Sequence, residues 1–283
     1  LDGGAGNDII DGGDGLADYV DYSTSSVGVV ASVNGSGTIN VTSSEGSDTV
    51  SNVEIFVGSN HDDTIIGGSN ADTLIGNDGD DLLQGNAGND TLDGGAGNDT
   101  LEGGLGDDNL IGSTGQDVVD YSNSASGVSI DLVNNQVVGE GSDTLSSIEH
   151  ANGSALNDVI IGDANVNTLR GNGGDDTLSG GAGNDTIDGS SGSDTLSYAT
   201  LNSAVDVDLV AATASNDGEG GSDTLISIEN VFGSSANDTI KGDANANTLS
   251  GNDGDDNLEG GAGDDYIDGG SGTDFVNYST ATQ

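Results

Sequence analysis

Aspartate recurs along this chain at a fixed interval of nine residues, and Ile, Leu or Val stands two positions after each one. Carboxylates are hard oxygen donors, which Ca²⁺ prefers as ligands together with backbone carbonyl groups. A short period repeated many times indicates a stacked, one-dimensional fold in which each turn contributes one carboxylate. The candidate metal ligands are Asp8, Asp63, Asp72, Asp81, Asp90, Asp99, Asp108, Asp117, Asp158, Asp176, Asp185, Asp194, Asp238, Asp256, Asp265 and Asp274.

Glycine fills the turns between these aspartates. The clearest copies of the repeat read GGAGNDTLE at 94–102, GGAGNDTID at 180–188 and GGAGDDYID at 260–268. Glycine at the first, second and fourth positions permits positive φ angles and a tight turn. The residues after the aspartate alternate out, in, out like a very short strand, so Leu101 is expected in the core.

The repeat resembles the RTX, or hemolysin-type calcium-binding, nonapeptide GGxGxDxUx. The resemblance implies an all-β fold, a right-handed parallel β-roll or β-helix solenoid with calcium ions in the Gly/Asp turns. Nine residues make half a coil, so alternate turns stack on one side. The resemblance implies that each calcium ion lies between two such stacked turns. The resemblance also implies glycine carbonyl ligands, here at Gly94, Gly97, Gly103, Gly106, Gly180, Gly183, Gly260 and Gly263.

The net charge of the chain is −48, and Arg170 and Lys241 are the only basic residues other than two histidines. Such acidity is typical of disordered chains, but here the acids are evenly spaced beside apolar residues, so multiple calcium ions are the expected counter-charge. We predict a metal-free chain that is unfolded or molten and a calcium form that is folded. Extracellular sites of this kind bind calcium at about 10⁻⁴–10⁻³ M.

The same composition excludes several classes of function. Nucleic-acid binding requires many Lys and Arg residues, which this chain lacks. No apolar run approaches the roughly 18 residues of a membrane span, so membrane insertion is not expected. The chain has no Cys and hence no disulfide or thiolate metal site. The isolated His61 and His150, and the absence of a nucleophile motif, indicate a protein that is not an enzyme.

A longer repeat is superimposed on the nonapeptide, because runs of nonapeptide turns, here called ladders, alternate with linking coils. The chain opens within a repeat, so we expect it to be a fragment of a longer repeat protein. The predicted order is the end of a ladder at 1–22, linking coils at 23–57, a seven-turn ladder at 58–121, linking coils at 122–152, a five-turn ladder at 153–198, linking coils at 199–232, and a five-turn ladder at 233–278 with a short tail at 279–283.

Three features of the linking coils and ladder ends have open interpretations. The paired acids Asp48/Glu54, Asp143/Glu149 and Asp223/Glu229 either bind further calcium or cap β-turns in contact with solvent. The tyrosines Tyr22, Tyr121, Tyr198 and Tyr278 stand where ladders end, and they are expected to cover the open end rather than to stack on sugars. Asn167 and Asn247 replace the repeated aspartate, so weaker sites are expected there.

The expected function is that of a calcium-binding structural region in a secreted or surface-attached bacterial protein, such as an adhesin, a surface-layer component or an extracellular filament. The resemblance implies passage through a secretion channel in the unfolded state, followed by calcium-driven folding outside the cell. Expected partners are calcium, copies of the chain end to end or side by side, and polysaccharide or a cell surface. The alternatives are an accessory or secretion module of a protease, lipase or alginate epimerase, and part of an RTX toxin.

Overall fold

The computed structural model describes residues 1–14, 18–33 and 38–278. The secondary structure of this described part consists of short strands, turns and bends. No helix long and apolar enough to cross a membrane occurs within it. The chain divides into two compact units, one formed by residues 1–121 and 135–150 and the other by residues 122–134 and 151–283. The expected tail at 279–283 lies outside the described residues.

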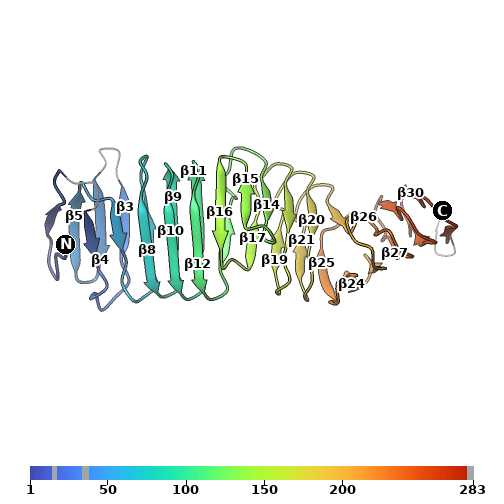
Figure 1. The fold of residues 1–283 in the computed structure, drawn as a ribbon, viewed down its shortest axis with the longest axis horizontal. Coiled ribbons are helices and arrows are strands. Elements are labelled where there is room, and N and C mark those ends of the chain that lie inside the picture. The colour runs from blue at the N-terminus through green and yellow to red at the C-terminus, as the bar shows by residue number, and fades with distance from the viewer. Residues whose placement is uncertain (15–17, 34–37, 279–283) are drawn as a thin grey trace. The chain divides into compact units, whose positions relative to one another are not determined.

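The first unit consists of two columns of strands, and the chain visits the columns alternately. In the first column, parallel pairing joins β2 (Tyr19–Asp21), β6 (Ile55–Val57), β8 (Thr73–Asp78), β10 (Thr91–Ala96), β12 (Asn109–Thr114) and β16 (Ser142–Ser146). In the second, it joins β3 (Val30–Val33), β7 (Thr64–Ile66), β9 (Leu82–Ala87), β11 (Thr100–Leu105) and β13 (Val118–Asp120). Figure 1 shows β8, β10 and β12 lying side by side.

The nonapeptide period sets both the register and the core. Leu92 of β10 pairs with Leu74 of β8 and with Leu110 of β12, so equivalent positions of alternate turns stack directly. The leucine at the second position of each such strand is buried and the residues on either side are partly exposed, as the sequence predicts. One buried side chain per turn stabilises a strand by only about 1.5–3 kcal/mol. A single turn is therefore unstable, and stacking is required.

The first linking coil contains antiparallel strands that pair with the ladder strands on either side. Within it, β3 pairs with β4 (Ile39–Ser43), and β4 pairs with β5 (Gly46–Ser51). The outer strands of this meander are parallel to ladder strands, because β5 pairs with β1 (Ile9–Asp11) and β3 pairs with β7. Similarly, β15 (Gln136–Val138) is antiparallel to β16.

The second unit has the same construction. One column contains β14 (Ser129–Asp131), β18 (Val159–Ile161), β20 (Thr177–Ser179), β22 (Thr195–Ser197), β26 (Asn230–Phe232), β28 (Thr248–Ser250) and β30 (Tyr266–Asp268). The other contains β19 (Thr168–Arg170), β21 (Thr186–Asp188), β25 (Asp223–Ile226), β24 (Thr213–Asn216), β23 (Asp206–Asp208), β27 (Thr239–Lys241), β29 (Asn257–Glu259) and β31 (Phe275–Val276). The short strand β17 comprises His150–Asn152. The expectation of an all-β parallel solenoid is confirmed.

Candidate metal centre

The ladder aspartates form columns in which each carboxylate is held by the backbone of the turn stacked against it. The amide of Asp81 donates to Oδ1 of Asp99 at 2.8 Å, and the amide of Asp99 donates to Oδ1 of Asp117 at 2.8 Å. The second ladder column repeats this contact from Asp72 to Asp90 and from Asp90 to Asp108. Every such pair is separated by 18 residues, which is two nonapeptides.

The second unit repeats the contact with the same spacing. The amide of Asp158 donates to Oδ1 of Asp176 at 2.8 Å, and the amide of Asp238 donates to Oδ1 of Asp256 at 2.8 Å. Asn247 fits the column as well, since its amide donates to Oδ1 of Asp265 at 3.0 Å. The backbone therefore keeps its register where the repeated aspartate is absent.

The other carboxylate oxygen, Oδ2, is buried without a hydrogen-bond partner in many of these residues. An ionised carboxylate can only accept hydrogen bonds, and a buried acceptor without a partner costs about 1–3 kcal/mol, with a larger cost for a charged group. A cation beside this atom offsets that cost, as buried charges are paired or coordinate metals. Within the described part of the chain, the buried, unpartnered Oδ2 atoms belong to Asp8, Asp18, Asp81, Asp90, Asp99, Asp108, Asp117, Asp176, Asp185, Asp194, Asp217 and Asp256.

A backbone carbonyl oxygen approaches the same place as this Oδ2. A Cβ atom added to Gly76 would lie 2.1 Å from Oδ2 of Asp81 and 2.4 Å from the carbonyl oxygen of Gly94. At Gly251 the corresponding distances are 2.1 Å to Oδ2 of Asp256 and 2.7 Å to the carbonyl oxygen of Gly269. A carboxylate and a carbonyl oxygen thus converge beside the first glycine of the motif. This is the mixed oxygen donor set that suits calcium.

The eight candidate glycines occupy two kinds of position. A Cβ on Gly94, Gly103, Gly180 or Gly260 would meet Oδ2 of the aspartate five positions later at 2.2–2.6 Å, so these glycines make room for the carboxylate. Gly97, Gly106, Gly183 and Gly263 have φ between 123° and 144°. A Cβ on Gly97 would lie 1.9 Å from the carbonyl oxygen of Gly79, so this glycine lets stacked turns approach closely.

Burial makes the ionised form of several ladder aspartates costly. Desolvation, with smaller contributions from neighbouring carboxylates, raises the pKa of Asp81, Asp176 and Asp185 to about 7, although the amide hydrogen bond to each opposes the shift. The same cause raises the pKa of Asp90 and Asp117 to about 6. Burial therefore favours a proton or a cation at these carboxylates.

The first aspartate of the seven-turn ladder and of both five-turn ladders differs from the others, because a serine donates hydrogen bonds to both of its carboxylate oxygens. The backbone amide of Ser59 donates to Oδ2 of Asp63 at 2.6 Å, and its hydroxyl donates to Oδ1 at 2.8 Å. Ser154 and Ser234 make equivalent contacts to Asp158 and Asp238. The sequence carries a signal for this, since Ser replaces the second glycine of the turn at these three positions. Sequence reasoning grouped these aspartates with the others.

Other candidate aspartates also differ from the interior ones. Oδ2 of Asp72 accepts the amide of Gly68 at 2.7 Å. Asp265 and Asp274 are only partly buried. At the asparagine positions, Oδ1 of Asn167 accepts the amide of Asp163 at 2.8 Å, so Asp163 contributes a backbone donor there. The aspartates inside the ladders, whose Oδ2 atoms have no hydrogen-bond partner, are therefore the strongest candidates for cation binding.

The acids of the linking coils continue the columns. Asp143 accepts the amide of Asp108 at Oδ1, and Glu149 accepts the amide of Asp117 at Oε2, each at 3.0 Å. The pairs Asp48/Glu54 and Asp223/Glu229 make the same contacts with the ladder turns next to them. The three aspartates are buried, so the interpretation as solvated turn acids is wrong for them, whereas the three glutamates are partly exposed.

The sites are not assembled from clusters of acidic side chains. No group of three or more His, Cys, Asp or Glu side chains suited to a metal ion occurs among the residues that the structure describes. His61 is exposed on a turn. Each candidate centre instead combines a ladder carboxylate with backbone carbonyl groups.

Comparison with known proteins agrees with this arrangement. A family model described as RTX calcium-binding nonapeptide repeat (4 copies) matches the chain several times and covers more than half of it. The matched segments are residues 1–15, 57–92, 84–119, 148–177, 161–196, 228–256 and 242–276, which correspond to the ladders. No curated protein matches the sequence.

Proposed function

Because the chain belongs to the RTX calcium-binding nonapeptide repeat family, we propose that it is a calcium-folded structural region of a secreted or surface-attached protein. The observation that supports this most strongly is the set of buried Oδ2 atoms without partners in the ladder interiors. A bound metal ion offsets the cost of burying these carboxylates. The positively charged side chains Arg170 and Lys241 are too few to neutralise them.

The calcium ligands would be the interior ladder aspartates together with the glycine carbonyl groups of the adjoining turns. Asp81 with Gly94 and Asp90 with Gly103 are two such combinations. Calcium accepts six to eight oxygen ligands in a flexible geometry, whereas magnesium requires a near-ideal octahedron and keeps its water. A repeated backbone site of this kind is therefore expected to select calcium.

Folding and metal binding are expected to be one process. Stacking brings carboxylates together inside each column, where their repulsion is not offset without a cation. A millimolar extracellular calcium concentration would fill such sites, while cytosolic calcium would leave the chain unfolded. This behaviour suits a chain that is exported unfolded and then folds outside the cell.

The role itself is proposed to be mechanical rather than catalytic. The repeats are of a structural calcium-binding type. Successive similar units joined by linking coils suit a stiff spacer or filament, such as part of an adhesin or surface layer, in which copies of the chain associate. Polysaccharide or a cell surface would then be contacted from this scaffold.

Calcium counting tests the proposal directly. Equilibrium dialysis followed by metal analysis is expected to give several calcium ions per chain at millimolar calcium, and far fewer magnesium ions under the same conditions. Light scattering before and after calcium addition then tests self-association. Absence of calcium binding at millimolar concentration contradicts the proposal, whereas binding without self-association leaves the calcium site intact and removes the filament.

A further inference from the structure

Two buried aspartates of the first unit have the position of ladder aspartates but different surroundings. Asp48 and Asp143 are 6% and 3% exposed. Their Oδ1 atoms accept the backbone amides of Asp8 and Asp108 at 2.9 and 3.0 Å, which is the contact that joins ladder aspartates. Each residue therefore occupies the position that follows the last ladder aspartate of its column, which is Asp8 for Asp48 and Asp108 for Asp143.

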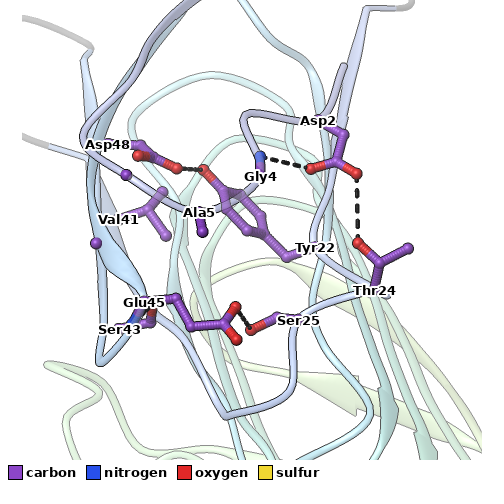
Figure 2. Close-up of a pocket in the computed structure, with 12 residues that line it drawn as sticks. Asp2, Gly4, Ala5, Tyr22, Thr24, Ser25, Val41, Ser43, Glu45 and Asp48 are labelled. Atoms are coloured by element: carbon purple, nitrogen blue, oxygen red, sulfur yellow. Dashed lines mark hydrogen bonds between the residues drawn. The ribbon is translucent and has the colours of Figure 1, made fainter.

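The difference lies at Oδ2, which accepts a hydrogen bond from a tyrosine hydroxyl. The distance from Tyr22 Oη to Asp48 Oδ2 is 2.8 Å, and the distance from Tyr121 Oη to Asp143 Oδ2 is 2.6 Å. Figure 2 shows the Tyr22 hydroxyl pointing at Asp48. Both residues line a cavity of about 210 Å³. In an interior ladder residue such as Asp99, this oxygen is the one without a partner.

Both tyrosines are held in place for this contact. Tyr22 and Tyr121 are 7% and 3% exposed, and the ring of Tyr22 stacks on Phe56 with centroids 5.5 Å apart. Desolvation, together with the adjacent carboxylate, raises the pKa of each hydroxyl well above its ordinary value. The hydroxyl therefore keeps its proton and remains a donor at every physiological pH.

We propose that the hydroxyls of Tyr22 and Tyr121 take the place of a cation at Asp48 and Asp143, so that a linking coil ends a column of calcium sites with a cap that needs no metal. The inference rests on calcium binding by the ladders. It assigns the two linking-coil aspartates to structure and not to ligation. The recurrence of a Tyr at the ladder end and of an Asp after it follows from this pairing.

The third linking coil lacks the close Tyr–Asp contact found in the first two. There the distance from Tyr198 Oη to Asp223 Oδ2 is 3.5 Å, at the limit of a hydrogen bond. Asp217 is fully buried nearby and its own Oδ2 has no partner. Desolvation raises the pKa of Asp223, and the charge of Asp217 raises it further. Among the described residues of the first two coils, none supplies this additional buried carboxylate. The cap is therefore assigned to Tyr22 and Tyr121 alone.

The test compares Asp143→Asn with Asp99→Asn in the full chain. Both aspartates are buried and both accept a backbone amide at Oδ1, from Asp108 at Asp143 and from Asp81 at Asp99, so the matched variants differ in the partner of the second oxygen. Equilibrium dialysis at saturating calcium is expected to show the original number of ions in Asp143→Asn and at least one ion fewer in Asp99→Asn. Loss of an ion from Asp143→Asn, as from Asp99→Asn, overturns the cap and leaves calcium binding by the ladders intact.

A second variant, Tyr121→Phe, tests the hydroxyl itself. It keeps the ring and leaves Asp143 Oδ2 without its donor, so a lower melting temperature in saturating calcium is expected, with no loss of bound ions. An unchanged melting temperature overturns the inference, because the hydroxyl would then contribute nothing. If the unsubstituted chain binds no calcium, both the proposed function and this inference are wrong. If the unsubstituted chain binds calcium but the variants do not behave as expected, only this inference is wrong.

Discussion

The backbone amide of Asp81 donates to Oδ1 of Asp99 at 2.8 Å, although the two residues are 18 positions apart. The contact connects stacked turns through a side chain that is also a candidate metal ligand. Oδ2 of Asp99 is left beside Gly94, where a Cβ would lie 2.2 Å from it. One residue type therefore sets the register of the solenoid and faces the candidate calcium site.

Replacing Asp99 with Ala is expected to cost more than replacing Asp8 with Ala. Asp99 is 1% exposed, and its loss removes the acceptor of the Asp81 amide together with a candidate calcium ligand. Asp8 is only partly buried and lies in the first ladder turn. We expect Asp99→Ala to lower the free energy of unfolding in calcium by about 3 kcal/mol. Thermal melts at fixed calcium check this ordering, and equal losses for the two variants would contradict it.

Gly97→Ala is expected to destabilise the first unit strongly. Gly97 has φ of 144°, and a Cβ there would lie 1.9 Å from the carbonyl oxygen of Gly79, so the stacked turns would have to separate. The matched control is Gly6→Ala, since Gly6 has φ of 133° and, among the residues that the structure describes, the only atom within 4 Å of its Cβ position is Oδ2 of Asp8 at 3.8 Å. The control carries the backbone strain of about 1–3 kcal/mol without the clash. Similar melting temperatures for the two variants would show that turn packing is not tight.

The two leucines of β11 are expected to respond differently to truncation. Leu101 is fully buried, whereas Leu105 is 55% exposed. Leu101→Ala removes a core side chain and leaves a cavity, which costs about 2–5 kcal/mol. Leu105→Ala is expected to change stability by less than about 0.5 kcal/mol. Denaturant unfolding in calcium measures both variants, and a large loss for Leu105→Ala would contradict the assigned core.

The metal-free chain is expected to become more stable as the pH falls. The pKa of Asp81 is raised in the folded state to about 7, above its ordinary value of 3.8, so protonation favours folding. The resulting stabilisation is fully present below pH 3.8 and is lost as the pH rises through about 7. Calcium-depleted protein should therefore contain more β-structure at pH 5 than at pH 8, as circular dichroism can measure. A metal-free β-content that increases from pH 5 to pH 8 would count against this.

Calcium binding should show the opposite dependence. Calcium requires the ionised carboxylate, so acid competes with the metal for the same oxygen. We expect the calcium concentration at half-saturation to increase from pH 8 to pH 5, measured by dialysis against buffered calcium. An affinity independent of pH would indicate ligands other than these carboxylates.

The period of the sequence predicted the solenoid because its signal is local and repeated many times. Each turn carries its own aspartate, glycines and apolar residue, so alternate stacking and the buried Leu columns follow from a single turn. The hydrogen-bond partners of individual carboxylates could not be predicted from the repeat. Tyr121 meets Asp143, which is 22 residues away, only after the linking coil is folded. The antiparallel pairing of β3, β4 and β5 was missed for the same reason.

The backbone conformation of the linking coils could not be predicted from the sequence pattern either. Asn52, Ser147 and Ser227 have φ of 53°, 53° and 50°, a left-handed conformation that non-glycine residues seldom adopt. A Cβ on Gly112 would lie 2.1 Å from the carbonyl oxygen of Ser147, and a Cβ on Gly189 would lie 2.3 Å from that of Ser227. These coil residues therefore place a carbonyl group where another ladder turn would place its own.

The most direct test of calcium-coupled folding is a far-UV circular dichroism titration with calcium, followed by reversal with EGTA. The account predicts a cooperative change from coil to β-structure near millimolar calcium, because the buried carboxylates of the ladders need cations before the turns can stack. EGTA should then return the coil spectrum. A β-rich spectrum at neutral pH that is the same in EGTA as in calcium would contradict the central claim.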